Sequence, residues 1–131
     1  MRFTNTWTNK EQDYDPDTEG YWIVRIKPGQ STRLADGSRW DLGCGDSATP
    51  QRSESAGLAE FALVLAVLPP ELHDKIALYK APCTFSVGGD VLVADHHQVP
   101  AELLEEARKA ASWWVNRDNF KRKHAMSSIA M

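Results

Sequence analysis

The sequence has few cysteines, no long hydrophobic run and little net charge. Cys44 and Cys83 are its two cysteines, whereas a small secreted domain usually carries a denser framework, so we expect two free thiols. No apolar segment typical of a signal peptide follows Met1, and the longest apolar stretch, residues 58–68, is well short of the ~20 residues that cross a bilayer. These absences predict a cytoplasmic protein with no membrane partner.

The composition fits one globular domain. The chain has 131 residues, of which 42% are apolar, and a domain typically has roughly 100–150 residues. This apolar content excludes wholesale disorder. The formal net charge of -3 excludes a generically basic nucleic-acid coat. The charge is uneven, because residues 101–131 carry six basic and four acidic groups and follow an acidic body.

Hydrophobic patterning divides the chain into three parts. Residues 1–20 are polar and rich in turn formers, which indicates an N-terminal arm or irregular loop. Residues 21–27 alternate as a strand should, and they open a single α+β domain that we expect to extend over 21–123. The last residues, 124–131, are expected to fray.

A hairpin around Asp36-Gly37 has a register that the sequence can predict. A two-residue loop would place Leu34 and Trp40 on opposite faces of the hairpin, whereas a three-residue loop places both on one face. A slip of one residue turns every side chain to the other face, so the apolar pattern should decide the register. We therefore predict the three-residue loop.

Three helices and a second hairpin complete the predicted fold. Residues 53–68 are apolar nearly all round, which indicates a buried helix, and Pro69-Pro70 should end it. We expect a shorter helix over 70–79, a hairpin pairing 83–87 with 91–95, and a third helix from Pro100 to about Asn116. The predicted class is α+β, a small antiparallel sheet of about five strands, built from hairpins and packed by about three helices.

An acidic run is the first candidate for a binding site. Its alternate carboxylates partly match a calcium-binding loop, but Thr18 stands where that loop needs glycine and Val24 where it needs glutamate. We interpret the run as a solvated acidic turn that can contact a basic partner. Its candidate contact residues are Asp13, Asp15, Asp17 and Glu19.

Histidines and cysteines do not show the spacing of a metal site. His96 and His97 are neighbours at a strand end, where successive side chains point to opposite faces. Zinc needs four convergent ligands, or three and a water, so we expect no metal and no cofactor. A small hydrolase that uses these histidines with Cys44 or Cys83 is the least supported alternative, and we expect no catalytic residues.

The basic C-terminal segment is the second candidate site. Aromatic rings interleaved with cations can bind an acidic protein surface or can stack on nucleic acid, although cations also simply complement a helix C-terminus. Trp7 and Trp113 are the two tryptophans least suited to the core. The candidate contact residues of this segment are Trp113, Arg117, Phe120, Lys121, Arg122 and Lys123.

These observations favour a non-enzymatic interaction protein. In its size, single domain and lack of catalytic motifs, the chain resembles small accessory proteins of phages and mobile elements, which often bind and inhibit or regulate a host protein. The alternative is a nucleotide- or nucleic-acid-binding protein that uses the basic segment. Opposite charges on one chain also favour association as a homodimer.

Overall fold

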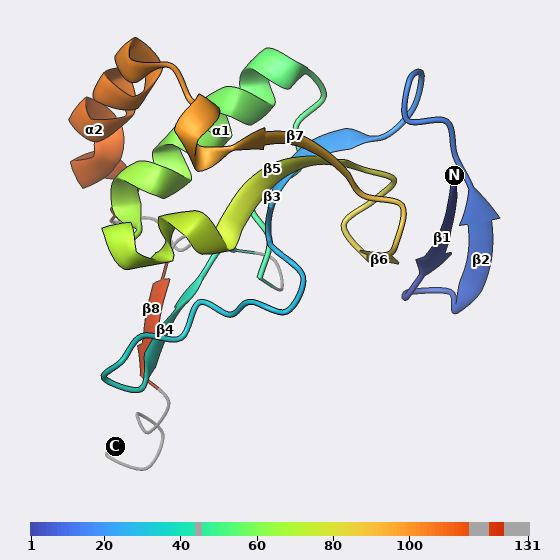
Figure 1. The fold of residues 1–131 in the computed structure, drawn as a ribbon, viewed down its shortest axis with the longest axis horizontal. Coiled ribbons are helices and arrows are strands. Elements are labelled where there is room, and N and C mark those ends of the chain that lie inside the picture. The colour runs from blue at the N-terminus through green and yellow to red at the C-terminus, as the bar shows by residue number, and fades with distance from the viewer. Residues whose placement is uncertain (44–45, 116–120, 125–131) are drawn as a thin grey trace.

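The computed structural model describes residues 1–43, 46–115 and 121–124 (Figure 1). Over these residues the chain forms strands in three small antiparallel sheets, two α-helices and two short 3₁₀ helices, so the predicted α+β class is confirmed. In the described part of the chain, no helix is both long and apolar enough to cross a membrane.

The central sheet consists of β3 (Tyr21–Ile26), β5 (Ile76–Ala81) and β7 (Val91–Asp95), in the order β3-β5-β7. Val24 lies opposite Leu78, which in turn lies opposite Ala94, and all three side chains are buried. The predicted strand at 21–27 is confirmed. Alternation placed it correctly because one of its faces packs against a helix.

Helix α1 (Glu54–Val67) packs on this sheet, and α2 (Ala101–Val115) packs on α1 (Figure 1). The hydroxyl of Ser53 accepts a hydrogen bond from the Ala56 N–H at 3.2 Å and caps the start of α1. Helix α1 is apolar on all sides because it is covered from two sides, by the sheet and by α2. The helices predicted over 53–68 and from Pro100 to about Asn116 are therefore confirmed.

The predicted helix over 70–79 is wrong. A 3₁₀ helix covers Pro70–Lys75, and β5 begins at Ile76 as the centre of the sheet. Ile76, Ala77 and Leu78 are all fully buried, because both faces of a central strand are covered. A strand buried on both faces loses its period-2 pattern, so it cannot be distinguished by periodicity from a helical segment.

The predicted hairpin of 83–87 with 91–95 is also wrong. β6 (Ser86–Val87) pairs with β1 (Arg2–Asn5), whereas β7 pairs with β5. Gly88 and Gly89 both have positive φ, 81° and 79°, and over these two residues the chain passes from one sheet to the other. The glycines therefore connect two sheets and do not close a hairpin.

The register predicted around Asp36-Gly37 is confirmed. The Leu34 N–H donates to the Ser38 carbonyl at 2.6 Å, and Arg33 lies opposite Arg39, so the loop has three residues. The second strand of this hairpin, β4 (Ser38–Asp41), pairs on its other side with β8 (Lys121–His124). Apart from His124, the predicted frayed tail lies outside the described residues.

Residues 1–20 are more regular than predicted. β1 forms a hairpin with β2 (Lys10–Asp13), and with β6 they make the N-terminal sheet in the order β2-β1-β6. Phe3 and Tyr14 pack edge to face beneath it at 5.6 Å. Every residue of β2 is exposed, which explains why hydrophobic patterning gave no strand signal there.

A close contact of helix and sheet at Gly57 generates a prediction. A Cβ at Gly57 would lie 2.6 Å from Trp22 Cβ, so Gly57→Ala forces α1 away from the sheet. Helix propensity alone would favour alanine by about 1 kcal/mol, but overpacking typically costs about 1–3 kcal/mol. We expect Gly57→Ala to lower the free energy of unfolding in urea denaturation. Ser55→Ala, at an exposed position of α1, is the control, and a Gly57→Ala variant as stable as wild type would contradict this packing.

Candidate functional site

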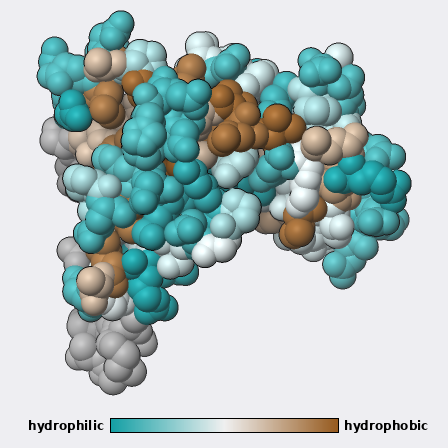
Figure 2. Space-filling model, in the orientation of Figure 1, coloured by the Kyte–Doolittle hydropathy of each residue, from teal (hydrophilic) through white to brown (hydrophobic). Residues whose placement is uncertain are grey.

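An apolar patch lies on the N-terminal sheet. It consists of Trp7, Phe85 and Val87, whose exposed fractions are 78%, 46% and 64%, and we call it the Trp7 patch. The Trp7 and Phe85 rings are tilted against each other with centroids 5.5 Å apart. Figure 2 shows hydrophobic surface on the N-terminal sheet near β6 and a second hydrophobic area over β7. Single exposed apolar residues are ordinary, but an exposed tryptophan packed on an exposed phenylalanine, with exposed Val87 two residues further along the chain, indicates a contact surface.

Local hydrogen bonds fix the turn that carries Trp7. The side-chain oxygen of Asn5 accepts the N–H of Trp7 at 2.9 Å and closes the turn between β1 and β2. The N–H of Thr6 donates to the Phe85 carbonyl at 2.8 Å, and the Thr6 hydroxyl donates to the same oxygen at 3.2 Å. The turn is therefore joined to a segment nearly 80 residues further along the chain. Hydrogen bonds therefore hold the backbone on both sides of the patch, at the turn that carries Trp7 and at Phe85.

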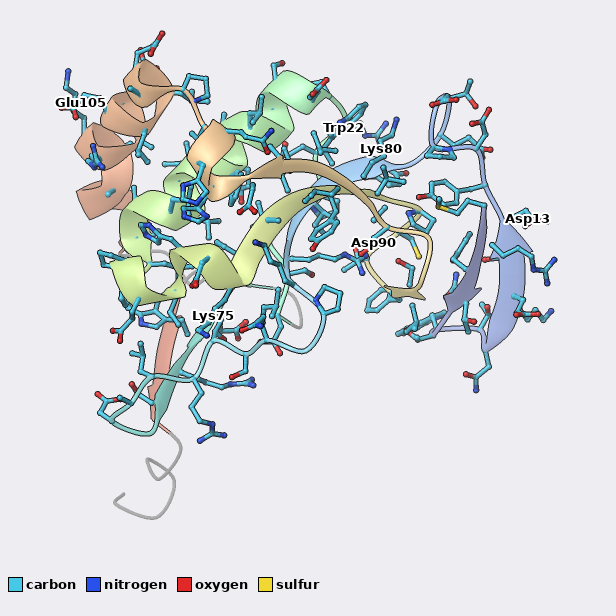
Figure 3. The ribbon with its side chains drawn as sticks, in the orientation of Figure 1. Asp13, Trp22, Lys75, Lys80, Asp90 and Glu105 are labelled. Atoms are coloured by element: carbon cyan, nitrogen blue, oxygen red, sulfur yellow. The ribbon has the colours of Figure 1, made fainter. Side chains whose placement is uncertain are left out.

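Arg25 of β3 holds that segment against the central sheet. Its guanidinium donates to the carbonyls of Cys83, Thr84 and Ser86 and forms an ion pair with Asp90 at 3.4 Å. Figure 3 shows Asp90 between the central and N-terminal sheets. Burial raises the pKa of Asp90, and the nearby Arg25 opposes this. We call this set of bonds the Arg25 clamp.

The acidic turn is held mainly by bonds within itself. Asp15 accepts the N–H of Asp17 at 3.0 Å and the hydroxyl of Thr18 at 3.1 Å, while Glu19 accepts the N–H of Asp15 at 3.1 Å. Asp13 lies in β2 and pairs with Arg2 at 3.5 Å. The structure therefore places the four predicted acidic residues in one turn and strand end, and Glu19 and Asp13 also line a cavity.

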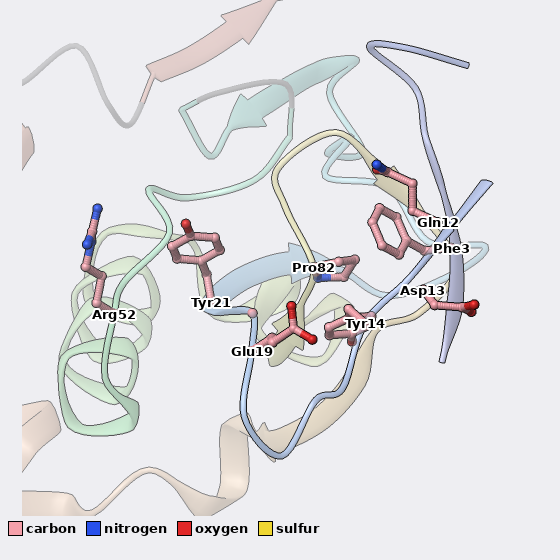
Figure 4. Close-up of a pocket in the computed structure, with 9 residues that line it drawn as sticks. Phe3, Gln12, Asp13, Tyr14, Glu19, Tyr21, Arg52 and Pro82 are labelled. Carbon is pink, nitrogen blue, oxygen red and sulfur yellow. The ribbon is translucent and has the colours of Figure 1, made fainter. Parts of the chain in front are cut away.

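That cavity has a volume of about 570 Å³ and lies where the N-terminal sheet meets the central sheet (Figure 4). In Figure 4 Phe3, Gln12 and Pro82 line it on the side of the N-terminal sheet, and Tyr21 and Arg52 line it on the opposite side. In Figure 4 the Glu19 carboxylate points into the space between Tyr21 and Pro82, whereas the Asp13 carboxylate points away from it.

The histidines come together more closely than their spacing indicated. The His96 and His97 ring centroids are 3.7 Å apart, and His73 lies 6.5 Å from His96. Within the described residues no group of three or more His, Cys, Asp or Glu side chains is arranged to hold a metal ion. The thiol of Cys83 is free, and Asp95 lies opposite Ala77, so the wrong hairpin prediction over 83–95 also misplaced Cys83 relative to these histidines.

The basic C-terminal candidates fall largely outside the described structure. Arg117 and Phe120 lie outside it, and of Trp113 only the backbone is described, as part of α2. Lys121, Arg122 and Lys123 belong to β8, in register with Asp41, Trp40 and Arg39. Because β8 is a strand, and the last turn of α2 contains no basic residue, these three residues do not form a basic helix end.

The sequence singles out Trp7 but does not indicate that Phe85 and Val87 belong with it, because the hairpin predicted over 83–95 is wrong. Arg25 was also not identified, although a cation in an otherwise apolar strand was a signal that something must pair with it. A comparison of the chain with protein families, curated proteins and solved structures finds no match, so no relative defines its class.

An ion pair beside the clamp generates a prediction of pH dependence. Asp95 accepts Lys27 Nζ at 2.9 Å and the His96 N–H at 2.8 Å, and the hydrogen bond from Lys27 is the main reason that its pKa falls from 3.8 to about 2. Because this pKa is lower in the folded than in the unfolded state, the charge of Asp95 stabilises the fold fully above pH ~4, and this contribution is lost as the pH falls to ~2.

We therefore expect Asp95→Asn to be less stable than wild type at pH 7, with the difference shrinking below pH ~4 and lost below pH ~2. Asparagine can retain the oxygen that accepts the His96 N–H, while it removes the charge and the oxygen that accepts Lys27. Urea denaturation across this pH range measures the effect, with Asp74→Asn as the exposed control. A difference that does not change with pH would exclude a role of the Asp95 charge.

Proposed function

We propose that this protein is a non-enzymatic binding protein, that its partner is another protein, and that the Trp7 patch makes the contact. The supporting observation is the 78% exposure of Trp7, whose ring packs on Phe85 while the turn that carries it is bonded on both sides. Tryptophan in a fixed position is typical of the residues that dominate binding energy at protein interfaces.

The charge around the patch also suits a protein partner. On the face of the N-terminal sheet that carries Val87, the exposed neighbours Arg2 and Glu11 form an ion pair at 2.9 Å, and Asp13 also contacts Arg2. A polar rim around apolar side chains is the usual composition of a non-obligate interface. Like the phage and mobile-element accessory proteins that it resembles in size and plan, the protein would act by covering a surface of a host protein in the cytoplasm.

The test is affinity capture from lysate of the organism that encodes the chain, analysed by quantitative mass spectrometry. We expect the combined Trp7→Ala and Val87→Lys changes to lower recovery of the partner at least about 30-fold, because truncation of a central interface residue costs at least ~2 kcal/mol. Leu92→Lys is the matched control, since Leu92 is a 55% exposed residue on the edge strand β7 of the other sheet.

The same variants separate binding from folding. Exposed substitutions change stability by about 0.5 kcal/mol or less, so thermal unfolding of both variants should match wild type. Equal capture by wild type and both variants would contradict the proposed contact. Capture that nuclease treatment abolishes would assign the partner to nucleic acid and not to protein.

A further inference from the structure

The cavity between the two sheets offers a negative charge beside aromatic surface. One Glu19 oxygen accepts the N–H of Asp15, and in the described part of the chain no cation pairs with this carboxylate. Tyr21, on the neighbouring wall, leaves 38% of its surface exposed, whereas Phe3 and Tyr14, which also line the space, are buried, so Tyr21 supplies the accessible ring. Figure 4 shows the Glu19 carboxylate between the Tyr21 ring and Pro82.

A guanidinium or ammonium group is the chemistry that fits this arrangement. A cation gains a charge-assisted hydrogen bond from a carboxylate and is attracted to the face of an aromatic ring. The planar guanidinium of arginine can make both contacts at once, because it stacks on rings and bonds in its own plane. A volume of about 570 Å³ also exceeds what one such side chain needs, so part of the adjoining backbone can enter.

We infer that this cavity receives an arginine or lysine side chain presented by a protein partner. This inference rests on the proposed function, because a protein partner supplies the side chain. It concerns a different site, since no residue of the Trp7 patch lines the cavity. Arg52 at the far end of the cavity opposes a cation, so its removal should strengthen binding while removal of the Glu19 charge weakens it.

A second polar cavity does not favour a charged ligand in the same way. It measures about 320 Å³ and is lined by Arg25 and Lys27, which would suit an anion. Both cations are already paired, Arg25 with Asp90 and Lys27 with Asp95. An anion there would have to compete with ion pairs that the fold already contains, whereas no described cation, Arg52 included, forms an ion pair with Glu19.

The experiment is an NMR titration of the full chain with a short capped peptide that contains one arginine among glycines and serines. The matched probe is the same peptide with citrulline, which keeps the shape and removes the charge. We expect the arginine peptide to shift the amide signals of residues 19–21 with a Kd on the order of 1 mM. Citrulline should weaken binding about three- to tenfold.

Substitutions test the same charges from the protein side. Glu19→Gln should weaken the arginine peptide about three- to tenfold, and Arg52→Gln should strengthen it about twofold at low salt. Glu11→Gln is the matched control, because Glu11 is an exposed acid on β2 that does not line the cavity. Equal binding of both peptides, no effect of Glu19→Gln, or signal shifts confined to other residues would each overturn the inference.

The outcome of the peptide titration is independent of the outcome of the lysate capture. A peptide that binds as expected while the Trp7 patch variants retain their partner supports the cavity and contradicts the proposed contact. A peptide that does not bind, with capture lost in the Trp7 patch variants, contradicts the cavity alone.

Discussion

The Arg25 clamp is the interaction on which the arrangement of the two sheets depends. Arg25 belongs to a strand whose neighbours along the chain are apolar, and its side chain is only 14% exposed. Burying a guanidinium is unfavourable unless its donors are used. The carbonyls of Cys83, Thr84 and Ser86 and the carboxylate of Asp90 supply partners for its two terminal nitrogens, while Nε is buried without a partner. These bonds hold the segment 83–90 against Arg25 of the central sheet.

This position of the segment determines what the rest of the chain can do. Its residues 86 and 87 become β6, which gives β1 a partner and completes the N-terminal sheet. The Tyr14 hydroxyl donates to the Gly89 carbonyl and attaches the same sheet at a second point. The Trp7 patch forms on the outside of this sheet and the acidic cavity between the two sheets, so both proposed contact sites depend on one buried cation. A buried ion pair is weak evidence for added stability, but the pair of Arg25 and Asp90 defines where the segment 83–90 lies.

The sequence predicted those parts of the fold that depend on neighbouring residues. The strand at 21–27, the two long helices and the three-residue loop after Leu34 all follow from local periodicity, capping and turn chemistry. The strand at Ile76 and the separation of β6 from β7 could not be predicted in this way, because each depends on pairing with a distant segment. A short buried strand and a turn of a helix can have the same apolar pattern.

The candidate site shows the same division. Trp7 stood out as a tryptophan with no place in the core, and the acidic turn was recognisable from its spacing. Two features of the site depend on contacts between segments far apart in the sequence and could not be predicted. Trp7 packs on Phe85, and of the four acidic residues Glu19 points into the cavity. The basic C-terminal residues stay a prediction, since the described structure gives only a backbone pairing for three of them.

The most direct test of this account is amide hydrogen exchange of Arg25→Met compared with wild type. Methionine keeps the apolar stem of Arg25 but removes its donors to the Thr84 and Ser86 carbonyls and its ion pair with Asp90, while the Cys83 carbonyl keeps only the Ser86 hydroxyl. The account predicts that exchange protection in β1 and β6 falls close to that of an open segment, while β5 and α1 remain protected. Unchanged protection in β1 and β6 would show that the N-terminal sheet is held without the clamp and would contradict the central claim.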